Sequence, residues 1–120
     1  MNGGKGTALV TGAARGIGKG IVEQLAAEGY RVVAIDRLPE VEETAAASRA
    51  RGHDVVAELC DVRDRQAIAA PAERHAPLDV IVNNAAITAT YPFEELTEEH
   101  FRETFDINTV GTFVVAQEGA

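Results

Sequence analysis

TALVTGAARGIGKG, residues 7–20, carries the strongest structural pattern of this chain. An apolar run of strand type opens it, three glycines follow, and an amphipathic segment begins within it, with Ile17, Ile21 and Leu25 four residues apart. A strand, a glycine turn and a helix in this order favour phosphate binding, because glycine lets the backbone approach a phosphate and a helix N-terminus offers free N–H groups. The alternative is a turn that needs glycine only for its positive φ. The three glycines of this cluster are Gly12, Gly16 and Gly18, and a fourth, Gly20, ends the quoted stretch.

The rest of the chain repeats this alternation of apolar runs and helical segments. We expect strands at residues 7–10, 31–35, 54–59 and 78–82. We expect helices at 16–28, from about Pro39 to before Gly52, from a cap at Asp61 to about His75, and from a cap at Thr97 nearly to the terminus. Nearly continuous apolar strands are typical of parallel sheets that helices cover on both faces. The order therefore predicts an α/β fold with a doubly wound parallel sheet, three layers (α/β/α) and strand order 3-2-1-4.

The composition describes a single domain over residues 1–120 and excludes two classes of partner. With 19 acidic and 11 basic side chains the net charge is −8, which disfavours nucleic acid, whose phosphates need clusters of Lys and Arg. No apolar run reaches the length of a membrane span. The single cysteine, Cys60, excludes an intramolecular disulfide, so we expect a reducing cytoplasmic location and a packing role for the thiol. The histidines show no metal-ligand spacing and are expected on the surface.

Asp36 ends the second expected strand, 18 residues after Gly18. In dinucleotide-binding folds an acidic residue at this place accepts hydrogen bonds from the ribose hydroxyls and repels a 2′-phosphate, which favours NAD. Arg15 and Arg37 could instead bind the 2′-phosphate of NADP. Asp36 could also be an ordinary acidic turn residue. We therefore expect NAD in preference to NADP.

Five motifs appear in an order and at intervals that resemble the short-chain dehydrogenase/reductase family, over nearly all of residues 6–118. They are TGAARGIG (11–18), Asp36, CDV (60–62), NNAA (83–86), and Asn108 within DINT (106–109). Each motif alone is a weak or moderate signal, whereas the five together are specific. The resemblance implies an oxidoreductase chain with a Rossmann-like NAD(P)-binding domain, truncated after the fourth βα unit.

The resemblance also implies roles for individual side chains. Asp61 would bond the adenine amino group beside the Val62 backbone, and residues 83–86 would form a wall beside the ribose groups. Asn108 matches the asparagine that bends the fourth helix and holds a water in the family's proton relay. Simpler roles are a helix cap for Asp61, a turn at residues 83–84, and interior packing for Asn108. The expected cofactor-binding residues are Gly12, Arg15, Gly16, Ile17, Gly18, Asp36, Arg37, Asp61, Val62, Asn83, Ala85 and Ala86.

Apart from Asn108, the residues of the family's chemistry are missing from these 120 residues. In the family a Tyr-x-x-x-Lys pair supplies the proton for hydride transfer at an alcohol or carbonyl carbon, and a serine orients the oxygen. Here Ala34 and Glu95 stand four residues after the two tyrosines, and the only serine is Ser48, in the second expected helix. We therefore expect an NAD(P)-binding chain that is inactive alone. The alternatives are a non-catalytic nucleotide-binding module and a truncated product that needs a complementing partner.

The expected strand order places the fourth strand at an edge of the sheet, where unpaired N–H and C=O groups favour association. The last helix is expected to bury Phe101, Phe105, Val110 and Phe113, with part of this apolar face lacking cover. We therefore expect a homo-oligomer or a chain that self-associates through this strand and helix. Pro71 lies within the third expected helix, where its missing N–H group predicts a kink or an early end.

Overall fold

The computed structural model describes residues 4–87 and 91–120. Within them, four strands form one parallel sheet in the order β3-β2-β1-β4, which confirms the predicted topology. β4 begins later than expected. The Asp79 carboxylate accepts the Thr7 N–H at 2.8 Å, and this side-chain bond takes the place of a ladder bond to a backbone carbonyl of a longer β4. The strands are β1 (Thr7–Thr11), β2 (Arg31–Asp36), β3 (Val55–Leu59) and β4 (Val80–Val82).

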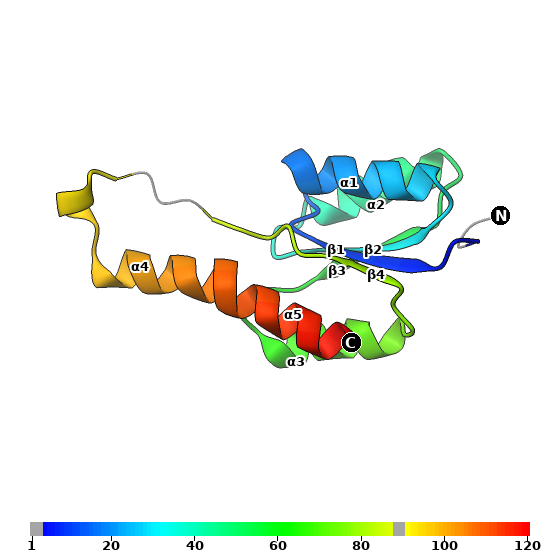
Figure 1. Cartoon of the computed structure of the whole chain (residues 1–120). Helices are drawn as coiled ribbons and strands as arrows, with labels where there is room; N and C mark the ends of the chain where they lie inside the picture. Colours follow the sequence, from blue (N-terminus) through cyan, green and yellow to red (C-terminus); the bar gives the residue numbers. More distant parts are fainter. Residues whose placement is uncertain (1–3, 88–90) are drawn as a thin grey trace.

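Helices cover both faces of the sheet, which gives the three layers that the sequence predicts (Figure 1). On one face lie α1 (Gly16–Ala27) and α2 (Val41–Ala50), and on the other α3 (Arg65–Arg74) and α5 (Gly111–Gly119). The central strands bury alternate side chains against the two helical layers. Toward α1 and α2 they direct Val10, Val32 and Ala34, and toward α3 and α5 they direct Leu9, Val33 and Ile35. This burial on two faces explains why the strands are continuously apolar.

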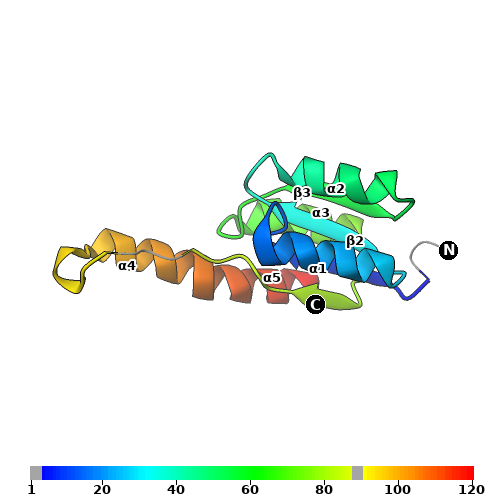
Figure 2. The same cartoon turned by 90° about the horizontal axis from the view of Figure 1, so that it is seen from above.

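The last helical stretch projects away from the sheet (Figures 1 and 2). A short 3₁₀ helix (Phe93–Glu95) precedes α4 (Glu98–Phe105), which continues through a π-helical segment (Asp106–Val110) into α5. Thr97 caps α4 as predicted: its hydroxyl accepts the His100 N–H, and the His100 ring accepts the Thr97 N–H. The molecule is accordingly elongated, with extents of 53 × 25 × 19 Å. No helix in the described ranges combines the length and the apolar character that crossing a bilayer requires.

The prediction that this helical stretch buries its aromatic face is wrong, whereas the expectation that part of this apolar face lacks cover is confirmed. Phe101, Phe105, Val110 and Phe113 are exposed, with 71%, 49%, 39% and 57% of their surface accessible. The stretch buries a different set, namely Ile107, Gly111, Val114 and Val115. Phe101 and Phe105 lie in α4, which extends beyond the end of the sheet, where the described part of the chain supplies no layer to cover them (Figure 2). Phe113 lies in α5, which buries Gly111, Val114 and Val115 instead.

α3 continues through Pro71 to Arg74, which excludes the early end, one of the two outcomes predicted at this proline. Proline has no N–H group for the carbonyl one turn earlier, which belongs to Ala67. That carbonyl oxygen instead accepts a hydrogen bond from the Cys60 thiol, with a sulfur–oxygen distance of 3.1 Å. Burial, and then the charge of Glu58, raise the pKa of the Cys60 thiol, so it stays a protonated donor. The thiol thus replaces the missing helical donor.

The expectation of surface histidines fails for His75, whose side chain is only 8% exposed. Its Nε2 lies 2.8 Å from one carboxylate oxygen of Glu58, and the Arg74 guanidinium lies 2.8 Å from the other. Burial alone would raise the pKa of Glu58, but the hydrogen bonds from Arg74 and His75 hold it below its usual value. This cluster joins the end of α3 to β3.

Candidate functional site

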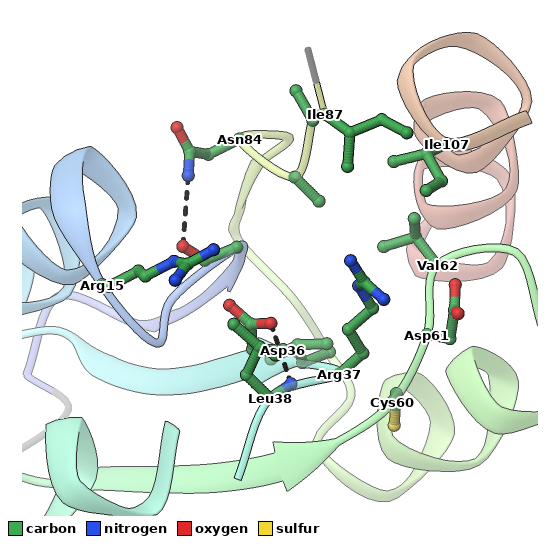
Figure 3. Close-up of a pocket in the computed structure, with 14 residues that line it drawn as sticks. Arg15, Asp36, Arg37, Leu38, Cys60, Asp61, Val62, Asn84, Ile87 and Ile107 are labelled. Carbon is green, nitrogen blue, oxygen red and sulfur yellow. Dashed lines mark hydrogen bonds between the residues drawn. The ribbon is translucent and has the colours of Figure 1, made fainter. Parts of the chain in front are cut away.

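A pocket of about 210 Å³ opens at the carboxyl ends of the strands, where the strand order reverses between β1 and β4 (Figure 3). Open parallel sheets bind ligands at such a point. Eight predicted site residues line the pocket, namely Gly12, Arg15, Asp36, Arg37, Asp61, Val62, Ala85 and Ala86. Five predicted residues are not among the lining residues, namely Gly16, Ile17, Gly18, Asn83 and Asn108. Six lining residues were not predicted as site residues: Ile35, Leu38, Cys60, Asn84, Ile87 and Ile107.

Each of the three glycines of the turn is required for a different structural reason. Gly12 has a φ of +66°, and a Cβ there would lie 2.7 Å from the side-chain nitrogen of Asn84. A Cβ on Gly18 would collide with the carbonyl oxygen of Gly12. Gly16 has a φ of +59°, yet a Cβ there would meet no described atom within 4 Å. Gly12 and Gly18 therefore allow close packing of β1, α1 and the end of β4, whereas Gly16 borders open space that a phosphate could enter.

α1 begins directly after this turn. Arg15 occupies the N-cap in an extended conformation, and its side chain makes no capping hydrogen bond to any described residue. Gly16 and Ile17 are exposed, and Ile17 keeps 77% of its surface accessible. The stripe that α1 buries lies one residue along from the expected one, at Gly18, Val22 and Ala26. An uncapped helix start offers free N–H groups and a positive partial charge to an anion.

The carboxylate of Asp36 ties the turn to the end of β2. One oxygen accepts the Ala14 N–H at 2.9 Å. The other accepts the Leu38 N–H at 3.0 Å (Figure 3). Each carboxylate oxygen has a second lone pair, so these bonds leave acceptor capacity for ribose hydroxyls. Arg15 and Arg37 line the same pocket. Asp36 therefore holds the turn through two backbone N–H groups while its side chain lines the pocket.

The sequence had suggested Asp61 as the cap of α3, and this prediction is wrong. Asp64 is the cap, and its carboxylate accepts the Ala67 N–H at 3.2 Å. The Asp61 carboxylate instead accepts the Arg63 N–H at 2.9 Å and pairs with the Arg63 guanidinium at 2.6 Å. The Arg63 side chain, as a hydrogen-bond donor, lowers the pKa of Asp61. Asp61 is therefore a fixed anion at the wall of the pocket.

Thr11 and Asn84 join the glycine turn to the segment after β4. The Thr11 hydroxyl oxygen accepts the N–H groups of Asn84 and Ala85, both at 3.0 Å. The Asn84 side-chain amide donates to the Gly12 carbonyl at 3.3 Å (Figure 3). Asn84 was predicted only as part of the wall at residues 83–86, whereas the individual cofactor-binding role was given to Asn83, which is exposed and outside the pocket. The alternation of side chains after β4 could have indicated that only one of the two faces the turn.

Asn108 lies in the π-helical segment, which agrees with the predicted irregularity of this helix. Its side-chain oxygen accepts the Ile87 N–H at 2.8 Å, and its side-chain nitrogen donates to the Ile87 carbonyl at 2.9 Å. Both hydrogen bonds fix the backbone of a lining residue of the pocket. Among all residues that the structure describes, no three His, Cys, Asp or Glu side chains gather as a metal site would require.

Comparison with known proteins gives the same description throughout. The family model "short chain dehydrogenase" matches residues 6–120. The oxidoreductase UcpA of Escherichia coli is 35% identical over 115 residues, which are 92% of this chain and 44% of that protein. The structure of a short chain dehydrogenase from Mycobacterium paratuberculosis bound to NAD matches with a TM-score of 0.88 at 31% identity, over 94% of this chain and 48% of that one.

A putative NAD(P)-dependent gluconate 5-dehydrogenase from Beutenbergia cavernae, with bound NADP at low occupancy, has a TM-score of 0.86 at 35% identity, over 94% of this chain and 47% of that one. The chain thus spans about half the length of the relatives that it matches. With the glycine turn, Asp36 and the pocket in place, this chain belongs to the short-chain dehydrogenase family of oxidoreductases.

Proposed function

We propose that the chain binds a nicotinamide dinucleotide in the pocket at the carboxyl ends of its strands. The observation that carries the proposal is the meeting there of an uncapped glycine turn and of Asp36. The turn would receive the pyrophosphate, and Asp36, Asp61 and Val62 would lie along the adenosine. One similar protein is described as bound to NAD and another as holding NADP. A bound nicotinamide would exchange a hydride with an alcohol or carbonyl carbon.

Within this proposal, the preferred cofactor is NAD(H). The Asp36 carboxylate would accept hydrogen bonds from the ribose hydroxyls and repel a 2′-phosphate. Arg15 and Arg37 act in the opposite direction, because each guanidinium attracts a phosphate. Asp36 is the partly buried member of the three, whereas both arginines are exposed and more strongly screened by solvent. The carboxylate therefore dominates the choice.

Isothermal titration with NADH and with NADPH tests this choice. We expect tighter binding of NADH, and Arg37→Ala should widen the difference between the two affinities. Asp36→Ala should narrow the difference and weaken both affinities, because Asp36 also holds Ala14. Equal or tighter binding of NADPH by the parent chain would mean that the arginines dominate. Failure to bind either dinucleotide would refute the proposed function itself.

We also propose that the 120-residue polypeptide alone does not turn over alcohols or ketones. Neither tyrosine, Tyr30 or Tyr91, is followed four residues later by lysine. The only serine, Ser48, is buried in α2 and does not line the pocket. The purified chain, assayed with NAD(H) and a panel of alcohols and ketones, should show no turnover. Reproducible turnover that the Gly12→Asp variant abolishes would overturn this part of the proposal.

A second copy of the chain is the partner that we propose. β4 pairs with β1 on one side, and no strand within the described residues pairs with its other side. Exposed Phe101, Phe105 and Phe113 add apolar surface along the last helical stretch. Light scattering should report particles larger than a monomer. Phe105→Glu should reduce their size, while Ala47→Glu, which adds the same charge at an exposed position of α2, should not. A compact monomer of the parent chain would contradict this proposal. A stable complex with a different chain that supplies the rest of the fold would instead favour the alternative of a truncated product that needs a complementing partner.

We finally propose that the chain is one domain and acts in the reducing cytoplasm. The described strands share one sheet, and both helical layers pack on it. Cys60 is free and partly buried, and it serves as a hydrogen-bond donor that an oxidised sulfur would lose.

A further inference from the structure

The hydroxyl of Thr44 connects α2 to the glycine turn. Thr44 is 1% exposed, and its Oγ1 donates to the Ala14 carbonyl at 3.2 Å, across 30 residues of sequence. A threonine within a helix commonly donates to a carbonyl of its own helix. Thr104 and Thr112 of this chain do so, each bonding the carbonyl four residues earlier. Thr44 departs from that arrangement and bonds the turn instead.

The peptide groups around Ala14 are held from both sides. The Ala14 N–H donates to the Asp36 carboxylate at 2.9 Å, while the Ala14 carbonyl accepts from Thr44. The preceding residue, Ala13, donates its N–H to the Ile35 carbonyl at 3.1 Å. Ala13 and Ala14 are buried, with 0% and 6% of their surface accessible. Three hydrogen bonds from β2 and α2 therefore fix the middle of the turn.

This attachment matters because a glycine lies on each side of Ala14 within the turn. Gly12 and Gly16 both adopt positive φ, and glycine alone can leave such a conformation at little steric cost. The amides that follow Ala14 are those of the uncapped start of α1. Their positions therefore depend on how firmly Ala14 is held.

We propose that Thr44 is a positioning residue for the pyrophosphate-binding turn, an inference that rests on the proposed function. Thr44 lines no part of the pocket and acts through Ala14. Without its hydroxyl, the Ala14 carbonyl is left buried without this donor, and the turn moves to satisfy it. The dinucleotide then loses affinity because part of its binding free energy is spent on restoring the turn.

Three variants of α2 test the proposal. Thr44→Val removes the hydroxyl and keeps the branched shape, whereas Thr44→Ser keeps the hydroxyl. Ser48→Ala is the matched control, because Ser48 is 2% exposed and lies one turn later on the same buried face. Isothermal titration should give an NADH affinity about five-fold weaker for Thr44→Val. The affinity of Thr44→Ser and of Ser48→Ala should match the parent.

Amide hydrogen exchange of the chain without cofactor provides the second readout. The Ala14 amide should exchange faster in Thr44→Val than in the parent, and at the parent rate in Thr44→Ser and Ser48→Ala. If the parent binds NADH and Thr44→Val binds it equally well, the inference is wrong. Equal losses of affinity in Thr44→Val and Ser48→Ala would overturn it too. If the parent fails to bind NADH, the proposed function is refuted, and unchanged exchange at Ala14 would separately refute the role of Thr44.

Discussion

Gly18 and Gly20 offer a matched pair of substitutions within one helix. Both lie in α1, and neither has a positive φ. A Cβ on Gly18 would collide with the Gly12 carbonyl oxygen and lie 2.6 Å from the Asn84 side-chain nitrogen, whereas a Cβ on Gly20 would meet no described atom within 4 Å. Replacement by alanine therefore isolates the effect of close packing between the helix and the turn.

The two substitutions should change the free energy of unfolding in opposite directions. Gly20→Ala should raise it by about 0.5–1 kcal/mol, because alanine loses less backbone entropy in a helix. Gly18→Ala gains the same term but forces backbone apart, which costs about 1–3 kcal/mol or more. Since the entropy term is common to both variants, they should differ by the packing cost, about 1–3 kcal/mol or roughly 4–15 °C in Tm, and the backbone collision should leave Gly18→Ala less stable than the parent.

Urea unfolding followed by far-ultraviolet circular dichroism measures both changes, with the slope of each transition as a check that the cooperativity is retained. The dinucleotide affinity of Gly18→Ala should also fall, because the helix start must move away from Gly12. If Gly18→Ala unfolds at the same urea concentration as Gly20→Ala, the packing argument for Gly18 is wrong.

Two further predictions concern the end of β3. Burial raises the pKa of the Cys60 thiol, so this thiol should react slowly with iodoacetamide at pH 8. The comparison is a Cys60→Ser/Leu59→Cys variant, whose thiol should react faster because Leu59 is 61% exposed. Equal rates would contradict the role of Cys60 as a buried donor. The pKa of Glu58 is lowered in the folded chain by Arg74 and His75 despite burial, so its contribution to stability is present above its unfolded pKa and is lost as the pH falls through the folded one. Unfolding titrations between pH 6 and pH 3 should show a smaller loss of stability in Glu58→Gln than in the parent, and parallel curves would refute this role.

Local patterns in the sequence were sufficient for the sheet and for part of the site. Continuous apolar runs separated by helical segments predict parallel strands. The alternation of these strands and helices predicts the strand order that the structure has. Gly12 and Asp36 were both predicted to bind the cofactor, and both line the pocket. These features depend on short stretches of chain and on the rule that parallel strands end at the same edge, so position in the sequence is enough to predict them.

Other features depend on which distant groups meet, and sequence spacing does not contain that information. Thr44 and Ala14 are 30 residues apart, and Asn84 and Gly12 are 72 apart, yet each pair is hydrogen-bonded. The burial of the aromatic stripe on the last helical stretch was mispredicted for the same reason, because helical periodicity identifies an apolar stripe but not whether another layer covers it. Burial and hydrogen bonding between elements follow from how the helices pack on the sheet, and they exist only once the chain has folded.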